Sequence, residues 1–132
     1  MTDDTTDWTE LREFAAVGLT QSFVLSWHFA ATSLMIDLDL FLCPEHPFYE
    51  KPRPSEKGCY RAAFLEFPAC TQVLEAGKME PIPPDALNQS LNPGRISGLR
   101  RSGEGRYEIF GKFGTVEILA DRPLLRIKDM SV

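Results

Sequence analysis

The sequence has few of the residues on which common catalytic and metal sites are built. It contains two histidines and three cysteines among its 132 residues. It has no glycine-rich phosphate loop, no dinucleotide-binding fingerprint, no Gly-x-Ser-x-Gly nucleophile motif and no His-Glu-x-x-His motif. These absences argue against the enzyme classes that such motifs define and leave few options for a catalytic centre. We therefore expect no cofactor.

Signals for export and for membrane insertion are also missing. Residues 1–7 are acidic and polar, unlike the basic start and apolar run of a secretory signal. The longest apolar-rich stretch, residues 22–42, is interrupted by serines, a histidine and two aspartates, which excludes a membrane span. The odd number of cysteines, Cys43, Cys59 and Cys70, favours reduced thiols. We expect a cytoplasmic protein without membrane contacts.

Charge and length narrow the class of protein further. The net charge of -5 disfavours binding to nucleic acid, because a phosphate backbone needs a basic surface. The same charge favours solubility or a basic protein partner. A chain of 132 residues has the length of one domain with a single core. We predict a disordered tail over residues 1–7 and a single β-rich domain over residues 8–132.

Residues 22–42 show the clearest structural pattern, that of a β-hairpin. The odd positions of the first arm and the even positions of the second arm are apolar, and side chains alternate between the two faces of a strand. One register brings both apolar rows to a common face. Its opposed pairs are Phe29–Leu34, Trp27–Ile36, Leu25–Leu38 and Phe23–Leu40. We interpret this face as the floor of the hydrophobic core.

The rest of the chain predicts short elements. A helix is expected over residues 8–16, after a capping box formed by Asp7 and Glu10, with Gly18 as its stop. Strand patterns occupy residues 59–67, 71–74, 96–101, 106–110, 115–120 and 124–128, and Asp85 is expected to cap one helical turn over 86–91. The predicted fold class is mainly β (α+β), an antiparallel β-sandwich or partly open barrel of about seven strands with one short N-terminal helix.

The last four strand patterns predict a meander with one apolar face. On that face Leu99 opposes Ile109, Ile109 opposes Val116, and Ile118 opposes Leu125. The first of these pairs requires an odd loop, which a bulge at Gly103 or Gly105 can supply.

The second face of the hairpin carries a candidate polar cluster of His28, Asp37 and Asp39. The predicted register places Asp37 opposite Ser26 and diagonal to His28, within hydrogen-bonding reach. A histidine oriented by a carboxylate is used both in general-base catalysis and in metal binding. The alternative is an ordinary solvated sheet face. We favour that alternative, because no nucleophile stands nearby at a defined spacing.

The proline-rich connection over residues 43–58 offers a second candidate site. Cys43 and His46 are spaced to share one metal ion, and Cys59 begins the next strand; Asp39 or Glu45 would complete four ligands of a zinc site. This arrangement would suit a metal-binding domain or a small metal-dependent enzyme. The alternative is that both cysteines are small buried hydrophobic residues and that His46 is a surface residue.

The same connection carries an aromatic pair. Phe48 and Tyr49, next to His46, lie on a segment stiffened by prolines, and aromatic side chains dominate interface energies. These three residues are candidate contacts for a protein partner. Alternatively, Phe48 folds down to cap the core.

Four arginines cluster around one predicted turn of the meander: Arg95, Arg100, Arg101 and Arg106. They could bind an anion. Charged residues at sheet edges also guard against aggregation, and we favour this interpretation.

The order of the strand motifs carries a resemblance. The motifs are Phe-Leu-Glu-Phe-Pro, Ile-Ser-Gly-Leu, Gly-Arg-Tyr-Glu-Ile-Phe and Gly-Thr-Val-Glu-Ile-Leu-Ala, after an apolar hairpin. In this rhythm the chain resembles small β-rich bacterial families, many of them uncharacterised and some of them immunity proteins of toxin systems. The resemblance runs from about residue 20 onward and carries no functional residue over.

Three functional hypotheses follow. The leading one is a non-enzymatic protein-binding module, with a protein partner that could be basic. The second is a metal-binding domain or metal-dependent enzyme that uses Cys43, His46 and Cys59. The third is a small-ligand carrier with a cavity lined by Trp27, Phe23 and Tyr107, since such sites are usually formed in advance. An exposed edge strand could pair two chains, so both a monomer and a homodimer are consistent with the sequence.

Overall fold

The computed structural model describes residues 6–52, 54–55 and 58–128. Within these residues, nine strands form one open antiparallel sheet. Eight of them follow the order β5-β8-β7-β6-β2-β3-β4-β9, and the ninth, β1, pairs with β6 outside this order. The strands are β1 (Thr6–Asp7), β2 (Val17–Ala30), β3 (Ser33–Leu42), β4 (Cys59–Phe67), β5 (Gln72–Glu75), β6 (Gly94–Gly103), β7 (Arg106–Gly111), β8 (Gly114–Leu119) and β9 (Leu124–Ile127). The predicted mainly β fold class is confirmed.

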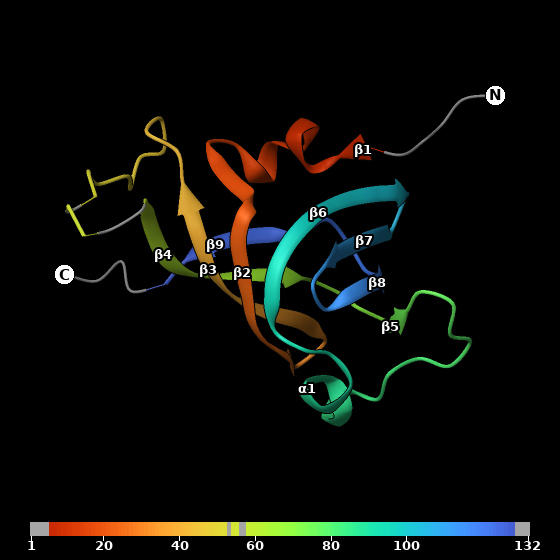
Figure 1. The fold of residues 1–132 in the computed structure, drawn as a ribbon. Coiled ribbons are helices and arrows are strands. Elements are labelled where there is room, and N and C mark those ends of the chain that lie inside the picture. Colours follow the sequence, from red (N-terminus) through yellow and green to blue (C-terminus); the bar gives the residue numbers. More distant parts are fainter. Residues whose placement is uncertain (1–5, 53, 56–57, 129–132) are drawn as a thin grey trace.

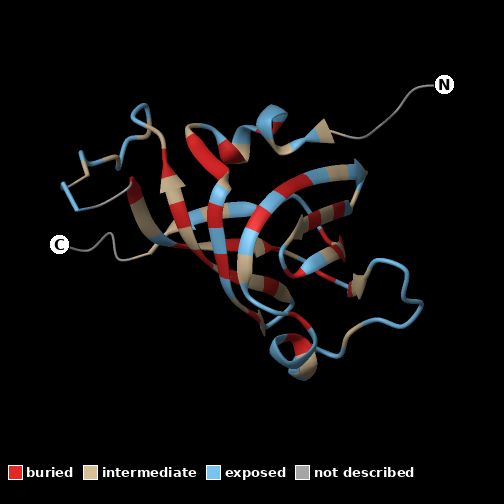
Figure 2. Cartoon of the chain, viewed as in Figure 1, coloured by how far each residue is buried: buried red, intermediate tan, exposed pale blue. Residues whose placement is uncertain are grey.

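The sheet curls so that its two halves face each other across one core (Figure 1). The curved strand β6 makes the turn, because its first residues pair with β2 and the rest of it pairs with β7. Aromatic rings from distant strands meet inside. The ring centroids of Phe67 and Tyr107 lie 5.3 Å apart, and those of Trp27 and Phe113 lie 5.1 Å apart. Buried residues alternate with exposed ones along the strands, which marks the concave side as the core (Figure 2).

The hairpin of β2 and β3 confirms half of the predicted register and corrects the other half. Trp27 opposes Ile36 and Phe29 opposes Leu34, as predicted. A bulge between Val24 and Ser26 then shifts the pairing, so that Val24 opposes Leu38 and Phe23 opposes Asp39. An extra residue in one strand reverses the faces beyond it. The predicted pairs Leu25–Leu38 and Phe23–Leu40 are therefore wrong, and both Phe23 and Leu25 are exposed.

A second irregularity in β2 is held by a buried serine. Between Gly18 and Phe23 the pairing with β3 shifts again. The Ser22 hydroxyl donates a hydrogen bond to the Gly18 carbonyl at 2.8 Å and accepts one from the Phe41 amide at 2.9 Å. These bonds replace ladder bonds that the irregularity removes, and they account for a fully buried hydroxyl. Gly18 lies inside β2 and does not stop a helix.

The predicted N-terminal helix is wrong. Two separate 3₁₀ turns occupy this region, η1 (Trp8–Glu10) and η2 (Arg12–Phe14), and Leu11 between them is extended. Asp7 does cap the first turn, since its carboxylate accepts from the Thr9 amide at 3.2 Å. The break at Leu11 lets both Leu11 and Phe14 reach the core. Of the predicted tail, residues 6–7 form β1 and residues 1–5 lie outside the described residues.

The meander is confirmed up to its last strand. Ile109 opposes Leu99 on one side and Val116 on the other, and the β6–β7 pairing shifts between Arg101 and Gly103, as the predicted bulge requires. The predicted pair Ile118–Leu125 is wrong, because β9 leaves the meander to pair with β4 and β5 takes its place beside β8. Alternation identifies the face of a strand but not its neighbour.

Helical structure is limited to short elements. The turn η3 (Pro84–Ala86) leads into α1 (Leu87–Ser90), which packs on β2. Asp85 lies inside η3 and makes no cap, which corrects its predicted role. Among the described residues no helix has the length and apolar character needed to cross a membrane.

Candidate functional site

The predicted polar cluster lies on the outer face of β2 and β3, opposite the core. Ser26 donates a hydrogen bond to the carboxylate of Asp37, and Lys128 Nζ lies 2.8 Å from Asp37 Oδ1. His28 Nδ1 lies 3.7 Å from Asp37 Oδ2. Burial raises the pKa of Asp37, but the bonds from Lys128 and Ser26 and the nearby positive charges outweigh it and lower the pKa below its usual value. Asp37 is thus a carboxylate held in an ion pair, and its lowered pKa makes it a poor general base.

Asp39 differs from Asp37 although both occupy this face of β3. It opposes Phe23 of β2 and Ala62 of β4. Among the described residues, no hydrogen bond or ion pair engages its carboxylate. Burial raises its pKa above the usual value, and none of the described residues supplies a charge that offsets the effect. Within the described ranges, Asp39 is therefore a partly desolvated negative charge without an ion-pair partner.

Three aromatic side chains occupy positions near Asp39 on the same face of the sheet, and we call them the aromatic cluster: Phe23, Phe41 and Tyr60. The rings of Phe41 and Tyr60 meet edge to face at 5.4 Å, and those of Phe23 and Tyr60 lie 6.2 Å apart. Phe23 is on β2 and Tyr60 is on β4, so these two rings lean toward each other across β3, which carries Asp39 and Phe41. The Tyr60 hydroxyl donates to the Gln21 carbonyl at 3.1 Å.

Sequence reasoning missed this cluster because it assigned Phe23 to the core. The available signal was the pair of glycines beside Phe41. A Cβ atom on Gly18 would lie 2.7 Å from Phe41 Cδ1, and one on Gly58 would also collide with the same ring. Glycines in or beside a strand often mark a close approach of another group, and here both leave room for the Phe41 ring on the outer face of the sheet.

The predicted metal ligands do not come together. Cys59 is buried and its Sγ accepts from the Glu50 amide at 3.5 Å, while His46 Nδ1 accepts from the Phe48 amide at 3.1 Å. Within the ranges that the structure describes, no three histidine, cysteine, aspartate or glutamate side chains are grouped to hold a metal ion. Burial and the charge of Glu45 raise the pKa of Cys43. A thiol that stays protonated is a weak ligand.

The aromatic pair of the 43–58 connection has two different roles. Tyr49 packs against the hydrophobic core and anchors the segment. Phe48 is 43% exposed, with its ring centroid 5.7 Å from that of His46. The alternative in which Phe48 caps the core is wrong, because its neighbour Tyr49 takes the core position. Phe48 remains available for contact.

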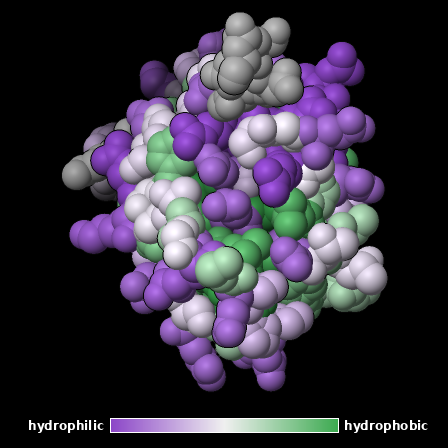
Figure 3. All heavy atoms as spheres, turned by 90° about the vertical axis from the view of Figure 1, so that its right-hand side faces the viewer, coloured by the Kyte–Doolittle hydropathy of each residue, from purple (hydrophilic) through white to green (hydrophobic). Residues whose placement is uncertain are grey.

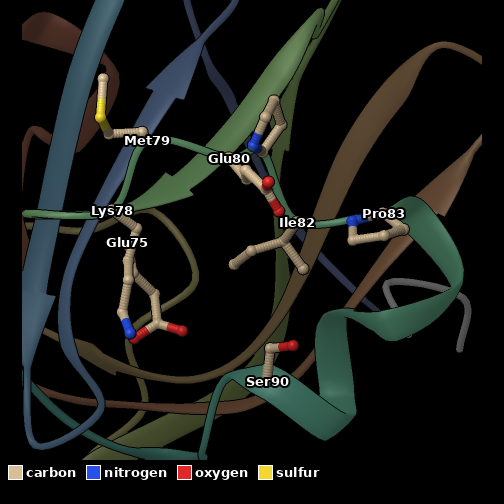
Figure 4. A pocket seen from close by; sticks show the side chains of 8 residues that line it. Glu75, Lys78, Met79, Glu80, Ile82, Pro83 and Ser90 are labelled. Carbon is tan, nitrogen blue, oxygen red and sulfur yellow. The ribbon is translucent and has the colours of Figure 1, made fainter.

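A shallow cavity of about 360 Å³ lies under the segment between β5 and η3. Figure 4 shows Ile82 pointing into it, with Glu75 and Lys78 on one side and Ser90 of α1 on another. On this side of the molecule, apolar side chains form the floor of a hollow with hydrophilic residues around it (Figure 3). Most of its lining comes from one exposed segment, and it gathers no set of catalytic groups.

The three side chains predicted to line the cavity of a small-ligand carrier lie on different faces of the sheet. Trp27 and Tyr107 are buried on the core side of the sheet, whereas Phe23 lies on the outer face. The three side chains therefore cannot line one cavity. Tyr107 does line a different cavity, at the end of the core near β6 and β7.

Comparison with known protein families, characterised proteins and solved structures finds no match for this chain. Its function must therefore be argued from its own residues.

Proposed function

We propose that the protein is a non-enzymatic binding module whose outer sheet face receives a basic side chain of a protein partner. The observation that carries this proposal is the carboxylate of Asp39, which has no partner among the described residues and lies beside the aromatic cluster. A carboxylate and several aromatic faces at one place form a site for an arginine or lysine side chain.

The energetics favour such a partner. Asp39 has already lost part of its hydration in the free protein, so an incoming cation gains its full attraction without a large new desolvation of the carboxylate. A cation over an aromatic face adds about 0.5–1 kcal/mol at an exposed site and more when water is excluded. Phe23, which opposes Asp39, and Leu25, two residues further along β2, add exposed apolar area to this face. The net charge of -5 would also steer a basic partner toward the protein.

Phe48 offers a second contact. Its connection begins directly after Leu42 and ends at Gly58, and the rings of Phe41 and Tyr60 lie near these two ends. Because Tyr49 anchors the segment, ordering Phe48 in an interface would cost little conformational entropy.

The polar cluster supports a binding role more than a catalytic one. Asp37 is engaged by Ser26 and Lys128, and the side chain of His28 is 44% exposed. Asp37 is held in an ion pair, and the His28 imidazole beside it is exposed to solvent. Acyl or phosphoryl transfer requires an oriented nucleophile next to such a base, and the described residues place none there.

The test is a binding measurement with matched variants. A partner captured by the wild-type protein is purified and its affinity is measured by calorimetry. Asp39→Asn and Phe23→Ser should each weaken binding at least about tenfold, which is 1.4 kcal/mol. Asp85→Asn changes the same residue type as Asp39→Asn, and Met79→Ser removes another exposed apolar side chain; both lie elsewhere on the surface and should have no effect.

The partner supplies the second half of the test. Replacing its contacting arginine or lysine by methionine should cause the same loss as Asp39→Asn, and the two changes should not add. Unchanged affinity in both Asp39→Asn and Phe23→Ser would remove the proposed site. Phe48→Ala tests the second contact separately.

A further inference from the structure

The outer face of the sheet already holds one of the protein's own cations. Lys128 Nζ lies 2.8 Å from Asp37 Oδ1 and 4.2 Å from the centroid of the Phe64 ring. Asp37 of β3 directly opposes Phe64 of β4, so the carboxylate and the ring lie side by side on one face. A carboxylate with an aromatic ring opposite it on the neighbouring strand is thus one arrangement by which this sheet binds a cation.

A second cation is held in a related way on β7. Arg100 Nε lies 2.6 Å from Glu108 Oε1, and the guanidinium carbon of Arg100 lies 5.4 Å from the centroid of the Phe110 ring. Glu108 and Phe110 are two residues apart on the same strand, so their side chains share a face. A carboxylate with an aromatic ring two positions further along its own strand is therefore a second arrangement for a cation.

Asp39 combines both arrangements. Phe23 of β2 directly opposes Asp39, which is the relation found at the lysine. Phe41 follows Asp39 by two residues on β3, which is the relation found at the arginine. Within the described ranges, no lysine or arginine lies within ion-pair distance of Asp39. The repeated pattern points to a cation that a partner supplies.

The charge of this face suits one added cation. Asp37 pairs with Lys128, and Arg126 Nη2 lies 3.7 Å from Glu66 Oε1, so these four charges cancel. With histidine counted as neutral, Asp39 gives the described part of this face a net negative charge. An incoming cation is therefore attracted by Asp39 and meets no excess of positive charge.

The two aspartates differ in what their oxygens leave free. Ser26 donates to Asp37 Oδ2, so Lys128 takes the other oxygen. Among the described residues, no group donates a hydrogen bond to either oxygen of Asp39. A carboxylate with both oxygens available matches the two parallel N–H groups of a guanidinium. A guanidinium is also more weakly hydrated than an ammonium, so it loses less on entering a partly desolvated site.

We propose that Asp39 and the aromatic cluster select an arginine of the protein partner over a lysine. This inference rests on the proposed function, since it names which basic side chain the outer face receives. Asp39 would accept two hydrogen bonds from the guanidinium group, whose plane would lie against the exposed ring of Phe23. Arginine and lysine carry the same charge, so the preference comes from shape and hydration.

The experiment is an NMR titration of the full ¹⁵N-labelled chain with three peptides, Ac-Leu-Xaa-Leu-NH2, in which Xaa is arginine, lysine or citrulline. The leucines supply apolar contact, and NMR measures the millimolar affinities expected of such short peptides. The amides of Asp39 and Ala62, which oppose each other on β3 and β4, should shift and saturate. The arginine peptide should bind at least about threefold more tightly than the lysine peptide, and the uncharged citrulline peptide should not saturate.

Matched variants separate the carboxylate from the ring. Asp39→Asn should abolish saturable binding of the arginine and lysine peptides alike, whereas Asp85→Asn should leave both affinities unchanged. Phe23→Leu keeps an apolar side chain at an exposed position but removes the aromatic face, so it should bring the two affinities closer together. The spectrum of each variant also reports whether it folds.

The outcomes distinguish this inference from the proposed function. Equal affinity for the arginine and lysine peptides, or tighter binding of the lysine peptide, would overturn the preference and leave the proposed function standing. If no peptide binds in a way that depends on Asp39, both fail. An Asp39→Asn variant that is less stable than the wild type at neutral pH would also overturn both, because the carboxylate would then have a partner within the chain.

Discussion

The carboxylate of Asp37 and the ammonium group of Lys128 lie 2.8 Å apart and join β3 to the residue after β9. Hydrogen bonds from Lys128 and Ser26 lower the pKa of Asp37 below 3.8 in spite of burial. A pKa that is lower in the folded state stabilises the fold above the unfolded value, and this stability is lost as the pH falls through the folded value. Asp37→Asn should cost about 1 kcal/mol at pH 7 and much less at an acidic pH at which the wild-type carboxylate is protonated, measured by urea denaturation. An equal cost at both pH values would contradict the ion pair.

Asp39→Asn should change the free energy of unfolding in the opposite direction to Asp37→Asn. Burial raises the pKa of Asp39 above 3.8, so its ionised form costs stability at neutral pH, and the cost disappears as the pH falls through the folded value. The amide removes the charge with little change in shape. We expect a gain in stability of up to about 1 kcal/mol at pH 7 that fades in acid. Asp85→Asn is the control, and a destabilised Asp39→Asn variant would show that the carboxylate has a structural partner.

Two adjacent apolar residues of β2 should respond very differently to truncation. Val24 is 1% exposed and Leu25 is 53% exposed because of the bulge. Val24→Ala should lower the free energy of unfolding by about 1–3 kcal/mol, whereas Leu25→Ala should stay within about 0.5 kcal/mol. A regular hairpin reverses the order, since it buries Leu25. Chemical denaturation of both variants therefore decides between the two registers.

The same bulge shows how far the sequence could lead. Alternation predicted the pairs around Trp27 and the outward position of Asp39, and the predicted bounds of β4 agree with the structure although its apolar residues do not alternate cleanly. It could not detect an extra residue where Val24 and Leu25 are both apolar, because either one satisfies the pattern. Phe23 was therefore placed on the wrong face, and the aromatic cluster, which needs Phe23 outside, was missed.

Alternation also cannot identify which strand pairs with β9 or on which side of the sheet Arg101 lies. The partner of β9 depends on how the whole sheet curls, and β4 offered a free edge as β8 did. A charged residue such as Arg101 on the core side also contradicts the usual rule that charges face solvent. Its position appears only when the register with Tyr107 is known.

Asn88 of α1 should stabilise the fold through the backbone of β2. Its side-chain oxygen accepts from the Trp27 amide at 2.8 Å, beyond the point where β2 stops pairing with β6 and where none of the described strands takes the place of β6. Asn88→Ala would leave a buried N–H group without an acceptor, at a cost of about 1–3 kcal/mol. Gln89→Ala in the same helix is the control and should be nearly neutral. Hydrogen exchange of the Trp27 amide should accelerate only in Asn88→Ala.

Gly18 should tolerate no side chain while Phe41 keeps its position. A Cβ atom there would lie 2.5 Å from Gln21 Oε1, the end of a flexible side chain that can move away, and 2.7 Å from Phe41 Cδ1, so Gly18→Ala must also displace a ring that packs on Tyr60. We expect a loss of about 1–3 kcal/mol in thermal or urea unfolding. Gly103→Ala is the matched control, because a Cβ atom on Gly103 of β6 would meet nothing closer than 4.0 Å.

A double variant shows whether the Phe41 ring causes this loss. Phe41→Leu makes room at Gly18, so Gly18→Ala should cost less in that background than in the wild type, a coupling of about 0.5–3 kcal/mol. If Gly18→Ala costs the same stability in the wild type and in Phe41→Leu, the loss has another cause than the Phe41 ring. Because Phe41 belongs to the aromatic cluster, Gly18→Ala should also weaken binding of a basic partner without changing the charge of the site. That result would separate the shape of the cluster from the charge of Asp39.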